Sequence, residues 1–408
     1  MNNQDTAFKK LSRLKVGALF MEMGTGKTKV ALDLIASKMH KVEYVLWICP
    51  CSLKDEIESE RMKWQPNIEI DVVGCESIGQ SDRIYMEYLK KVQDHKTFII
   101  VDESLKIKNI HTKRTKRIII MGDNAAYKLV LNGTPISKNI LDLWTQMEFL
   151  SPKILGMSYN QFKNNYCEYY QTGKLKGLVR KHHNIPHLVA KISPYIFDCS
   201  LDIDTKKERH EIAYSLFDKH EYESYKMDLL GMYSDGEDIN FNAFAIKLQQ
   251  YYTENSNRKK IITELLNDID AGTIIFVRFL QSIPKDAHMI TGDQNENERK
   301  QILSDFKDGL FKTLYITYGC GSFGLNLQFC KNMIFAEHTW DYAQRIQAEA
   351  RIYRMGQGSS VDYYDMVCKE SGLEDMILRC ISKKADILDE VKKEIENKGG
   401  VKEWVKTI

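Results

Sequence analysis

A short apolar run that ends in a glycine turn and a Lys-Thr pair constrains the fold of this chain more than any other stretch. Residues 16–21 are Val-Gly-Ala-Leu-Phe-Met, a composition typical of a buried parallel strand. Gly24 and Gly26 follow, and glycine allows backbone conformations that are closed to other residues. Apolar residues from Val30 to Met39 then recur at helical spacing. A strand, a glycine turn and a helix N-terminus in this order direct backbone N–H groups at an anion, so the sequence predicts a phosphate-binding turn.

The two residues that open the predicted helix supply the remaining chemistry of a nucleoside triphosphate site. The Lys27 ammonium is expected to reach the β- and γ-phosphates of ATP, and the Thr28 hydroxyl is expected to bind Mg²⁺. Met21 stands where the P-loop pattern has its first glycine, so the turn is built from Gly24 and Gly26. An ordinary strand-to-helix turn is the alternative interpretation.

A second buried strand ends in two adjacent carboxylates. Residues 97–103 are Thr-Phe-Ile-Ile-Val-Asp-Glu, in which four apolar residues precede Asp102 and Glu103. Two carboxylates at the end of an apolar strand are costly unless a cation meets them. We therefore expect Asp102 to hold Mg²⁺, directly or through water, and Glu103 to polarise the attacking water. An exposed turn is the alternative.

Polar groups at two further strand ends are expected at the same sheet edge, because ligands of open α/β sheets meet the loops at the carboxyl ends of the strands. Ser52 and Lys54 follow the strand Tyr-Val-Leu-Trp-Ile-Cys and are candidate contacts for a polymeric substrate, with Ser52 as a helix cap the alternative. Thr134 lies in a turn after another apolar strand, where its hydroxyl could link the γ-phosphate to the substrate side. The basic stretch 106–117 predicts either a solvated face or a contact with phosphate backbones.

The second half of the chain repeats the α/β pattern and follows it with a basic helix. Apolar strands are predicted at residues 273–277, 312–317 and 332–336. On the helix predicted next, Gln347, Arg351 and Arg354 fall at i, i+4 and i+7, on one face. Two planar, permanently charged donors on one stripe suit a triphosphate. A solvated basic face is the alternative.

Composition limits the partners. The 58 basic and 56 acidic residues nearly balance, which argues against a protein that holds nucleic acid by bulk charge and leaves a local groove open. No apolar run approaches the roughly 20 residues of a membrane span, and no signal peptide precedes the first strand, so we expect a cytoplasmic protein of a bacterial or phage-infected cell. The nine cysteines form no Cys-x-x-Cys pair, as expected for reduced structural thiols.

The 408 residues are too many for one core and predict an α/β protein with three segments. Residues 1–150 are expected to form a first parallel-sheet domain, and residues 256–408 a second one. The second domain is expected to end in brace helices at residues 373–380 and 384–396. Residues 151–255 are expected to form helical protrusions and a linker. Helix-period segments are predicted at residues 205–230 and 241–267.

Together these motifs resemble those of the superfamily-two helicases, in the same order. They are Met-Gly-Thr-Gly-Lys-Thr, Asp-Glu-Ser-Leu, Asn-Gly-Thr-Pro-Ile, Gly-Leu-Asn-Leu and Gln-Ala-Glu-Ala-Arg-Ile-Tyr-Arg-Met-Gly-Gln. Residues 132–152 and 347–357 are most similar to the Swi/Snf-type ATPases, which are double-stranded DNA translocases. The resemblance covers nearly the whole chain, and the motifs are highly specific only as a set.

The resemblance implies two RecA-like domains with ATP and Mg²⁺ in the cleft between them. It implies ATP contacts at Gln4, Gly24, Thr25, Gly26, Lys27 and Thr28, where Gln4 would read adenine unless it is only a solvated terminal residue. The implied catalytic residues are Lys27, Glu103, Gln347, Arg351 and Arg354, with the two arginines as arginine fingers. Contacts to DNA, or its coupling to ATP, would fall on Ser52, Lys54, Thr134, Ser322 and Asn326.

Three positions depart from the family pattern. Ser104 and Leu105 replace the usual small residue and histidine, which puts the coupling contact of that histidine in doubt, and Asn132 stands where threonine is usual. The chain shows no chromatin-reading module or zinc finger, and so it resembles a compact motor of a phage or mobile element.

The combined expectation is a monomeric, ATP-dependent translocase that acts on DNA, duplex or branched. A strand-separating or branch-migrating helicase in replication, recombination or repair would use the same motor. A nucleotide-gated clamp with little turnover is the third hypothesis, and the intact Lys27, Glu103, Arg351 and Arg354 argue against it.

Overall fold

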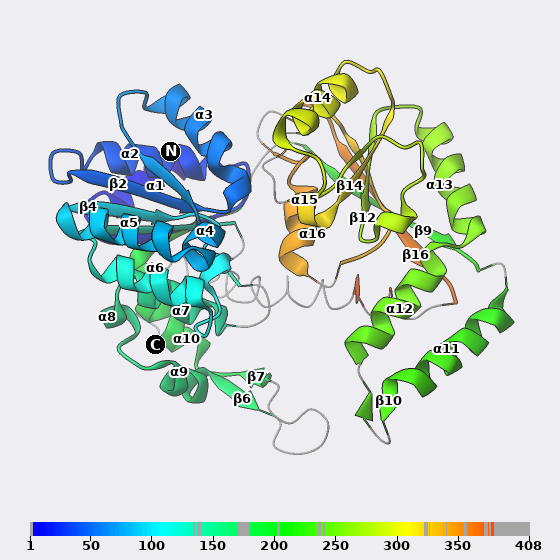
Figure 1. The fold of residues 1–408 in the computed structure, drawn as a ribbon, viewed down its shortest axis with the longest axis horizontal. Helices are drawn as coiled ribbons and strands as arrows, with labels where there is room; N and C mark the ends of the chain where they lie inside the picture. The colour runs from blue at the N-terminus through cyan, green and yellow to red at the C-terminus, as the bar shows by residue number, and fades with distance from the viewer. Residues whose placement is uncertain are drawn as a thin grey trace. The chain divides into compact units, whose positions relative to one another are not determined.

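The computed structural model folds into two compact units, one within residues 3–201 and the other within residues 205–378 (Figure 1). Each unit contains a six-stranded parallel sheet with helices on both faces, which confirms the predicted α/β fold class with two parallel sheets. No helix in the described part of the chain combines the length and the apolarity needed to cross a bilayer. The structure describes residues 3–133, 135–136, 140–169, 179–201, 205–216, 218–235, 238–239, 241–321, 325, 327–339, 341–354, 357–370, 374 and 377–378.

The sheet of the first unit has the strand order β3-β2-β4-β5-β1-β8, and every neighbouring pair is parallel. Parallel strands of this kind are buried on both faces, which explains their nearly continuous apolar composition. The carboxyl ends of all six strands therefore lie at one edge of the sheet. The strands are β1 (Val16–Met21), β2 (Tyr44–Cys49), β3 (Asp71–Gly74), β4 (Thr97–Val101), β5 (Tyr127–Asn132) and β8 (Ile196–Cys199).

Two helical layers enclose this sheet, and the side chains of β1 divide between them. Leu19 and Met21 pack with the first layer, whereas Ala18 and Phe20 pack with the second, as the two-residue period of a strand requires. The first layer contains α1 (Asn3–Leu11), α2 (Lys27–Ala36) and α3 (Lys54–Trp64). The second contains α4 (Cys75–Gln80), α5 (Asp82–Asp94), α6 (Lys113–Asp123), α7 (Asp142–Leu150), α8 (Pro152–Leu155), α9 (Tyr159–Tyr166) and α10 (Ile185–Ile192), and a ribbon of β6 (Cys167–Tyr169) and β7 (Val179–His182) follows α9.

The second unit repeats this plan with the strand order β13-β14-β12-β15-β16-β9, again parallel throughout. Its strands are β9 (Lys207–Tyr214), β12 (Thr273–Val277), β13 (Met289–Ile290), β14 (Thr313–Thr317), β15 (Asn332–Phe335) and β16 (Val361–Cys368). One face packs against α11 (Lys219–Tyr233), α12 (Phe241–Thr253) and α13 (Ser256–Ile269), and a short ribbon of β10 (Ser234–Asp235) and β11 (Asp238–Ile239) joins the first two helices. The other packs against α14 (Glu296–Lys307), α15 (Tyr318–Gly321) and α16 (Tyr342–Glu349).

The prediction of a helical segment at residues 205–230 is wrong in its first part. Its first part is the edge strand β9, which pairs with β16 over its whole length, and the helix begins only at Lys219. Ile212 and Tyr214 pack into the core while Glu211 is exposed, so the apolar period at this end is two residues and not that of a helix. Residues 151–255 divide between the two units. The closing helices predicted at residues 373–380 and 384–396 fall almost wholly outside the described residues.

The contact of α6 with α7 makes the packing of the first unit testable at Gly122. A methyl group at this position would lie 2.7 Å and 2.8 Å from two ring carbons of Phe149, which is fully buried. We expect Gly122→Ala to lower the free energy of unfolding by about 1–3 kcal/mol through overpacking, measured by urea denaturation. The double variant with Phe149→Leu should lose less free energy of unfolding than the sum of the losses in the two single variants. Strict additivity would contradict this account of the contact.

Candidate active site

The glycine turn between β1 and α2 has the backbone form expected of an anion cradle. Gly24 and Gly26 adopt left-handed conformations with φ of 79° and 86°, which a residue with a side chain rarely adopts. Gly26 has no side chain to cap the first N–H groups of α2, so these donors remain suited to an anion. Thr25 is buried, and its hydroxyl donates to the Glu22 carbonyl at 2.6 Å, which holds the turn closed.

Gln4 lies against this turn. Its Nε2 donates to the Thr25 carbonyl at 3.1 Å from α1, and a methyl group on Gly26 would collide with the same amide. Gln4 is therefore a half-buried neighbour of the turn and not the solvated terminal residue of the alternative interpretation. The role of its amide toward adenine stays a prediction.

Lys27 reaches back from the first turn of α2 to the end of β1. Its Nζ donates to the Met21 carbonyl at 2.8 Å, with the Glu22 carbonyl at 3.4 Å. A Cβ atom on Gly133, directly after β5, would lie 3.5 Å from the same Nζ. The ammonium thus lies at the carboxyl edge of the sheet, between the ends of β1 and β5.

Asp102 and Glu103 follow β4 at the same edge. Asp102 is buried, and its Oδ1 accepts the Glu103 N–H at 2.9 Å. Burial, followed by the charge of Glu103, raises the pKa of the Asp102 carboxyl to about 7, and the charge of Lys27 opposes this rise. Glu103 is half-buried and has a left-handed φ of 48°, a strained conformation for a residue with a side chain.

These residues fit the magnesium ion that the sequence implies. Mg²⁺ prefers hard oxygen ligands and usually keeps several waters, so one carboxylate and one hydroxyl suffice. A cation at Asp102 would offset the burial that raises its pKa. Asp102 and the half-buried Thr28 at the start of α2 are the groups that would hold it.

The remaining predicted contacts of the first unit have different outcomes. Lys54 is exposed at the start of α3, directly after the turn that holds Ser52, and both follow β2, the neighbour of β4. Leu53 precedes α3 and no side chain caps this helix, so Ser52 is not its cap. Thr134 lies outside the described residues, as do Ser322 and Asn326 in the second unit.

Most cations of the basic stretch 106–117 are already paired within the unit. Arg117 is buried, donates to the Ile78 carbonyl at 2.8 Å and pairs with Asp82. Lys113 also pairs with Asp82, at 2.8 Å. Lys106 and Arg114 lie 3.6 Å and 4.0 Å from a Glu76 carboxylate oxygen. These contacts favour a structural role for most of the stretch.

The predicted helix that would carry Gln347, Arg351 and Arg354 on one face is wrong in its second half. Helix α16 ends at Glu349, so only Gln347 is helical, and the two arginines lie in the turn after it. Gln357 supports this turn, because its Nε2 donates to carbonyls of Ile352, Gln328 and Cys330 at 3.0–3.1 Å. Arg351 is buried and Arg354 half-buried.

A buried charge cluster that the sequence did not reveal holds α16 in place. Arg345 is almost fully buried, with Nε 2.7 Å from Glu349 and a terminal nitrogen 2.7 Å from Asp365 on β16. Its guanidinium stacks on the Phe335 ring, 3.3 Å from the centroid. Arg209 on β9 donates to the other oxygen of Glu349 at 2.6 Å. The charges neutralise one another, so the position of α16 is tied to the edge of the second sheet.

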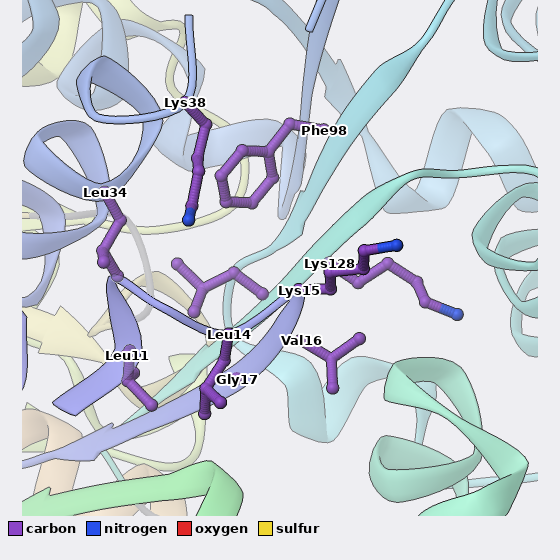
Figure 2. A pocket seen from close by; sticks show the side chains of 10 residues that line it. Leu11, Leu14, Lys15, Val16, Gly17, Leu34, Lys38, Phe98 and Lys128 are labelled. Atoms are coloured by element: carbon purple, nitrogen blue, oxygen red, sulfur yellow. The ribbon is translucent and has the colours of Figure 1, made fainter. Parts of the chain in front are cut away.

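A pocket at the opposite edge of the first sheet is separate from this site. It is lined by Leu11, Leu14, Lys15, Val16, Gly17, Leu34, Lys38, Phe98, Lys128 and Leu129, near the amino ends of β1, β4 and β5. Figure 2 shows Lys38 beside the Phe98 ring, whereas Lys15 and Lys128 point away from Leu34. Lys38 already donates to the Ser12 carbonyl, and none of the predicted site residues that the structure describes lines this pocket.

Two family descriptions match the chain in series. The SNF2-related domain matches residues 83–271, and the helicase conserved C-terminal domain matches residues 245–356. Together they span well over half of the sequence. The chain carries an SNF2-related domain followed by a helicase conserved C-terminal domain. These two matches confirm the resemblance drawn from the motifs, and the two parallel sheets agree with the predicted tandem of RecA-like domains.

Relatives match most of this chain at low identity. An uncharacterized ATP-dependent helicase of Mycoplasma pneumoniae is 24% identical over 91% of the chain, which spans 40% of that relative. A SWI/SNF-related matrix-associated actin-dependent regulator of chromatin subfamily A-like protein 1 homolog of Caenorhabditis elegans is 24% identical over 91% of the chain and 58% of the relative. The SWI2/SNF2 ATPase core of Sulfolobus solfataricus, solved in complex with dsDNA, is 21% identical with a TM-score of 0.42, covering 96% of this chain and 95% of that one.

The charge cluster of α16 predicts a large effect for Arg345→Met. The substitution leaves Glu349 and Asp365 buried without their main cation, so the second unit should lose about 3–5 kcal/mol of stability, measured by denaturant unfolding. Lys312→Met is the matched control, since it breaks an ion pair with Asp270 in which both side chains are mostly exposed, and it should have little effect. Equal losses for the two variants would refute the bracing role.

Proposed function

We propose that this chain is an ATP-dependent DNA translocase that hydrolyses ATP at the carboxyl edge of its first sheet. The observation that carries the proposal is the convergence of three features at this edge. They are the left-handed glycine turn with its uncapped helix N-terminus, the Lys27 ammonium, and the buried Asp102 beside Glu103. The matches to an SNF2-related domain and to a helicase conserved C-terminal domain support the same assignment.

In this proposal the turn at residues 24–28 binds the phosphates of ATP and Gln4 reads the adenine. Lys27 gives up its hydrogen bond to the Met21 carbonyl and binds the β- and γ-phosphates instead, where its positive charge stabilises the negative charge of the transition state. Thr28 and Asp102 would hold Mg²⁺, which would supply positive charge to neutralise the phosphates. Glu103 takes the proton of the attacking water, and its fixed position next to Asp102 keeps the base beside the metal ligand.

The second unit contributes charge to the same reaction. Arg351 and Arg354 are proposed to stabilise the charge that develops on the transferred phosphoryl group, as arginine fingers do, with Gln347 nearby. DNA is bound through its phosphates and without sequence readout. The proposed DNA contacts or coupling residues are Ser52, Lys54, Thr134, Ser322 and Asn326. The near-neutral net charge implies that few of the contacts are made to phosphates. The protein is proposed to act as a monomer in the cytoplasm.

Replacing Glu103 with glutamine tests the reaction. The amide keeps the size of the side chain but cannot take a proton, so Glu103→Gln should bind ATP normally and hydrolyse it at least tenfold more slowly, a change of ~1.4 kcal/mol in the barrier. Steady-state turnover and the affinity for a fluorescent ATP analogue give the two readouts. Lys27→Ala is the companion variant, and it should lose turnover and bind the ATP analogue more weakly. Near-normal turnover of Glu103→Gln would remove this carboxylate as the general base.

The substrate is tested by comparing nucleic acids at matched nucleotide concentration. Blunt duplex DNA should stimulate turnover at least as well as poly-dT, and far better than duplex RNA. Raising the salt concentration should weaken DNA binding by roughly 0.9 log units per phosphate contact per log unit of salt, a shallow slope for few contacts.

Each of the other outcomes would assign a different activity to this protein. A preference for poly-dT or RNA contradicts duplex translocation. Selective stimulation by a forked substrate with strand separation identifies a branch-migrating helicase. ATP binding without turnover, with or without DNA, identifies a nucleotide-gated clamp.

A further inference from the structure

A buried side-chain network begins at the residue after the two carboxylates. Ser104 follows Glu103 at the start of the short 3₁₀ turn η2 (Ser104–Ile107) and is completely buried. Its hydroxyl donates to Gln146 Oε1 at 2.6 Å and accepts from Asn132 Nδ2 at 3.4 Å. Gln146 belongs to α7 and Asn132 ends β5, so the network joins three elements that are distant in the sequence.

Gln146 links the turn after β4 to the turn after β5. Its Nε2 donates to the Pro135 carbonyl at 2.8 Å, and to the Asp142 carbonyl one turn earlier in α7 at 2.8 Å. Both N–H donors and the oxygen are therefore used. Rotating the amide by half a turn would place its oxygen against two carbonyls, so the bonds themselves fix the orientation.

An apolar side chain at position 146 would fill the same space without making these hydrogen bonds. The neighbouring buried residues Leu143, Met147, Phe149 and Leu150 give α7 an apolar face, and Gln146 interrupts it with an amide of zero exposure. Burying an amide stabilises little by itself, because its hydrogen bonds mainly repay the loss of water. What the amide adds is a fixed distance between two turns, since satisfied buried networks specify one geometry.

Both turns carry parts of the candidate active site. One holds Glu103 in its strained left-handed conformation directly before Ser104. The other begins at Gly133, which lies against the Lys27 ammonium. We propose that Gln146 is a positioning residue that ties the turn after β5 to the Glu103 carboxylate through Ser104, so that a shift of either turn moves the other. The catalytic consequence rests on the proposed function, in which Glu103 is the base and DNA acts at the turn after β5.

The network is tested with Ser104→Ala, Gln146→Leu and the double variant. Each single change should lower kcat for DNA-stimulated ATP hydrolysis by about tenfold and leave the affinity for a fluorescent ATP analogue within about twofold, since the bound phosphates contact neither side chain. The double variant should lose little more than a single one, because the residues act as a unit. Thr97→Val is the matched control. Thr97 is also fully buried, and its hydroxyl donates to the His95 carbonyl at 2.9 Å at the opposite end of β4.

A loss of stability in all three single variants, with kcat reduced no more by Ser104→Ala or Gln146→Leu than by Thr97→Val, would overturn the proposal and leave a purely structural network. Additive losses in the double variant would also overturn it.

Amide hydrogen exchange of the nucleotide-free protein keeps the test independent of turnover. Gln146→Leu should accelerate exchange in the peptide covering residues 103–107, on the far side of the network, and Thr97→Val should not. Unchanged exchange there would refute the link whatever the enzyme assays give. A wild-type chain without ATPase activity would instead refute the proposed function and leave the exchange result standing.

Discussion

The burial of the Asp102 carboxyl at the edge of a parallel sheet is the constraint on which the first unit depends. A carboxylate withdrawn from water beside a second carboxylate is unfavourable, and the pKa of Asp102 rises accordingly to about 7. The fold tolerates this because parallel strands bring Lys27 to the same edge and because the Glu103 N–H donates to Asp102. Both contacts offset this cost only in part, because the pKa of Asp102 remains raised, and this supports the proposed cation site.

The sequence predicted the parts of this edge that depend on local pattern. The strand ends before the glycine turn and before Asp102 could be located because apolar runs stop there and polar residues follow, and the structure places β1 and β4 accordingly. The left-handed glycines follow from the same reasoning, since few other residues fit such a turn. The roles of these residues in catalysis stay predictions until the variants are measured.

What the sequence did not predict depends on partners that are far apart in the chain. Ser104 is separated by 42 residues from Gln146, and no spacing rule links a serine after a strand with a glutamine in a helix. The signal that was available is a lone amide within the apolar stretch of α7. Helix α16 was extended too far because the i, i+4, i+7 spacing continues past Glu349, whereas bonds from the Gln357 side chain stabilise a turn there. Strand β9 was missed because its outward residues are charged and resemble a helical surface.

The second unit contains a buried carboxylate whose two oxygens are both paired with groups of the protein itself. Glu337 follows β15 and has no exposed surface, yet one oxygen pairs with the buried Arg258 and the other accepts the Arg278 N–H at 2.8 Å. Such a pair leaves little reason to bind a cation. Asp102 occupies the corresponding kind of place after β4, but its neighbours are a second carboxylate and a lysine that bonds to backbone carbonyls. The chain thus pairs one strand-end carboxylate with an arginine and sets the other beside a second carboxylate, and this difference supports the proposal that the chemistry lies on the first unit.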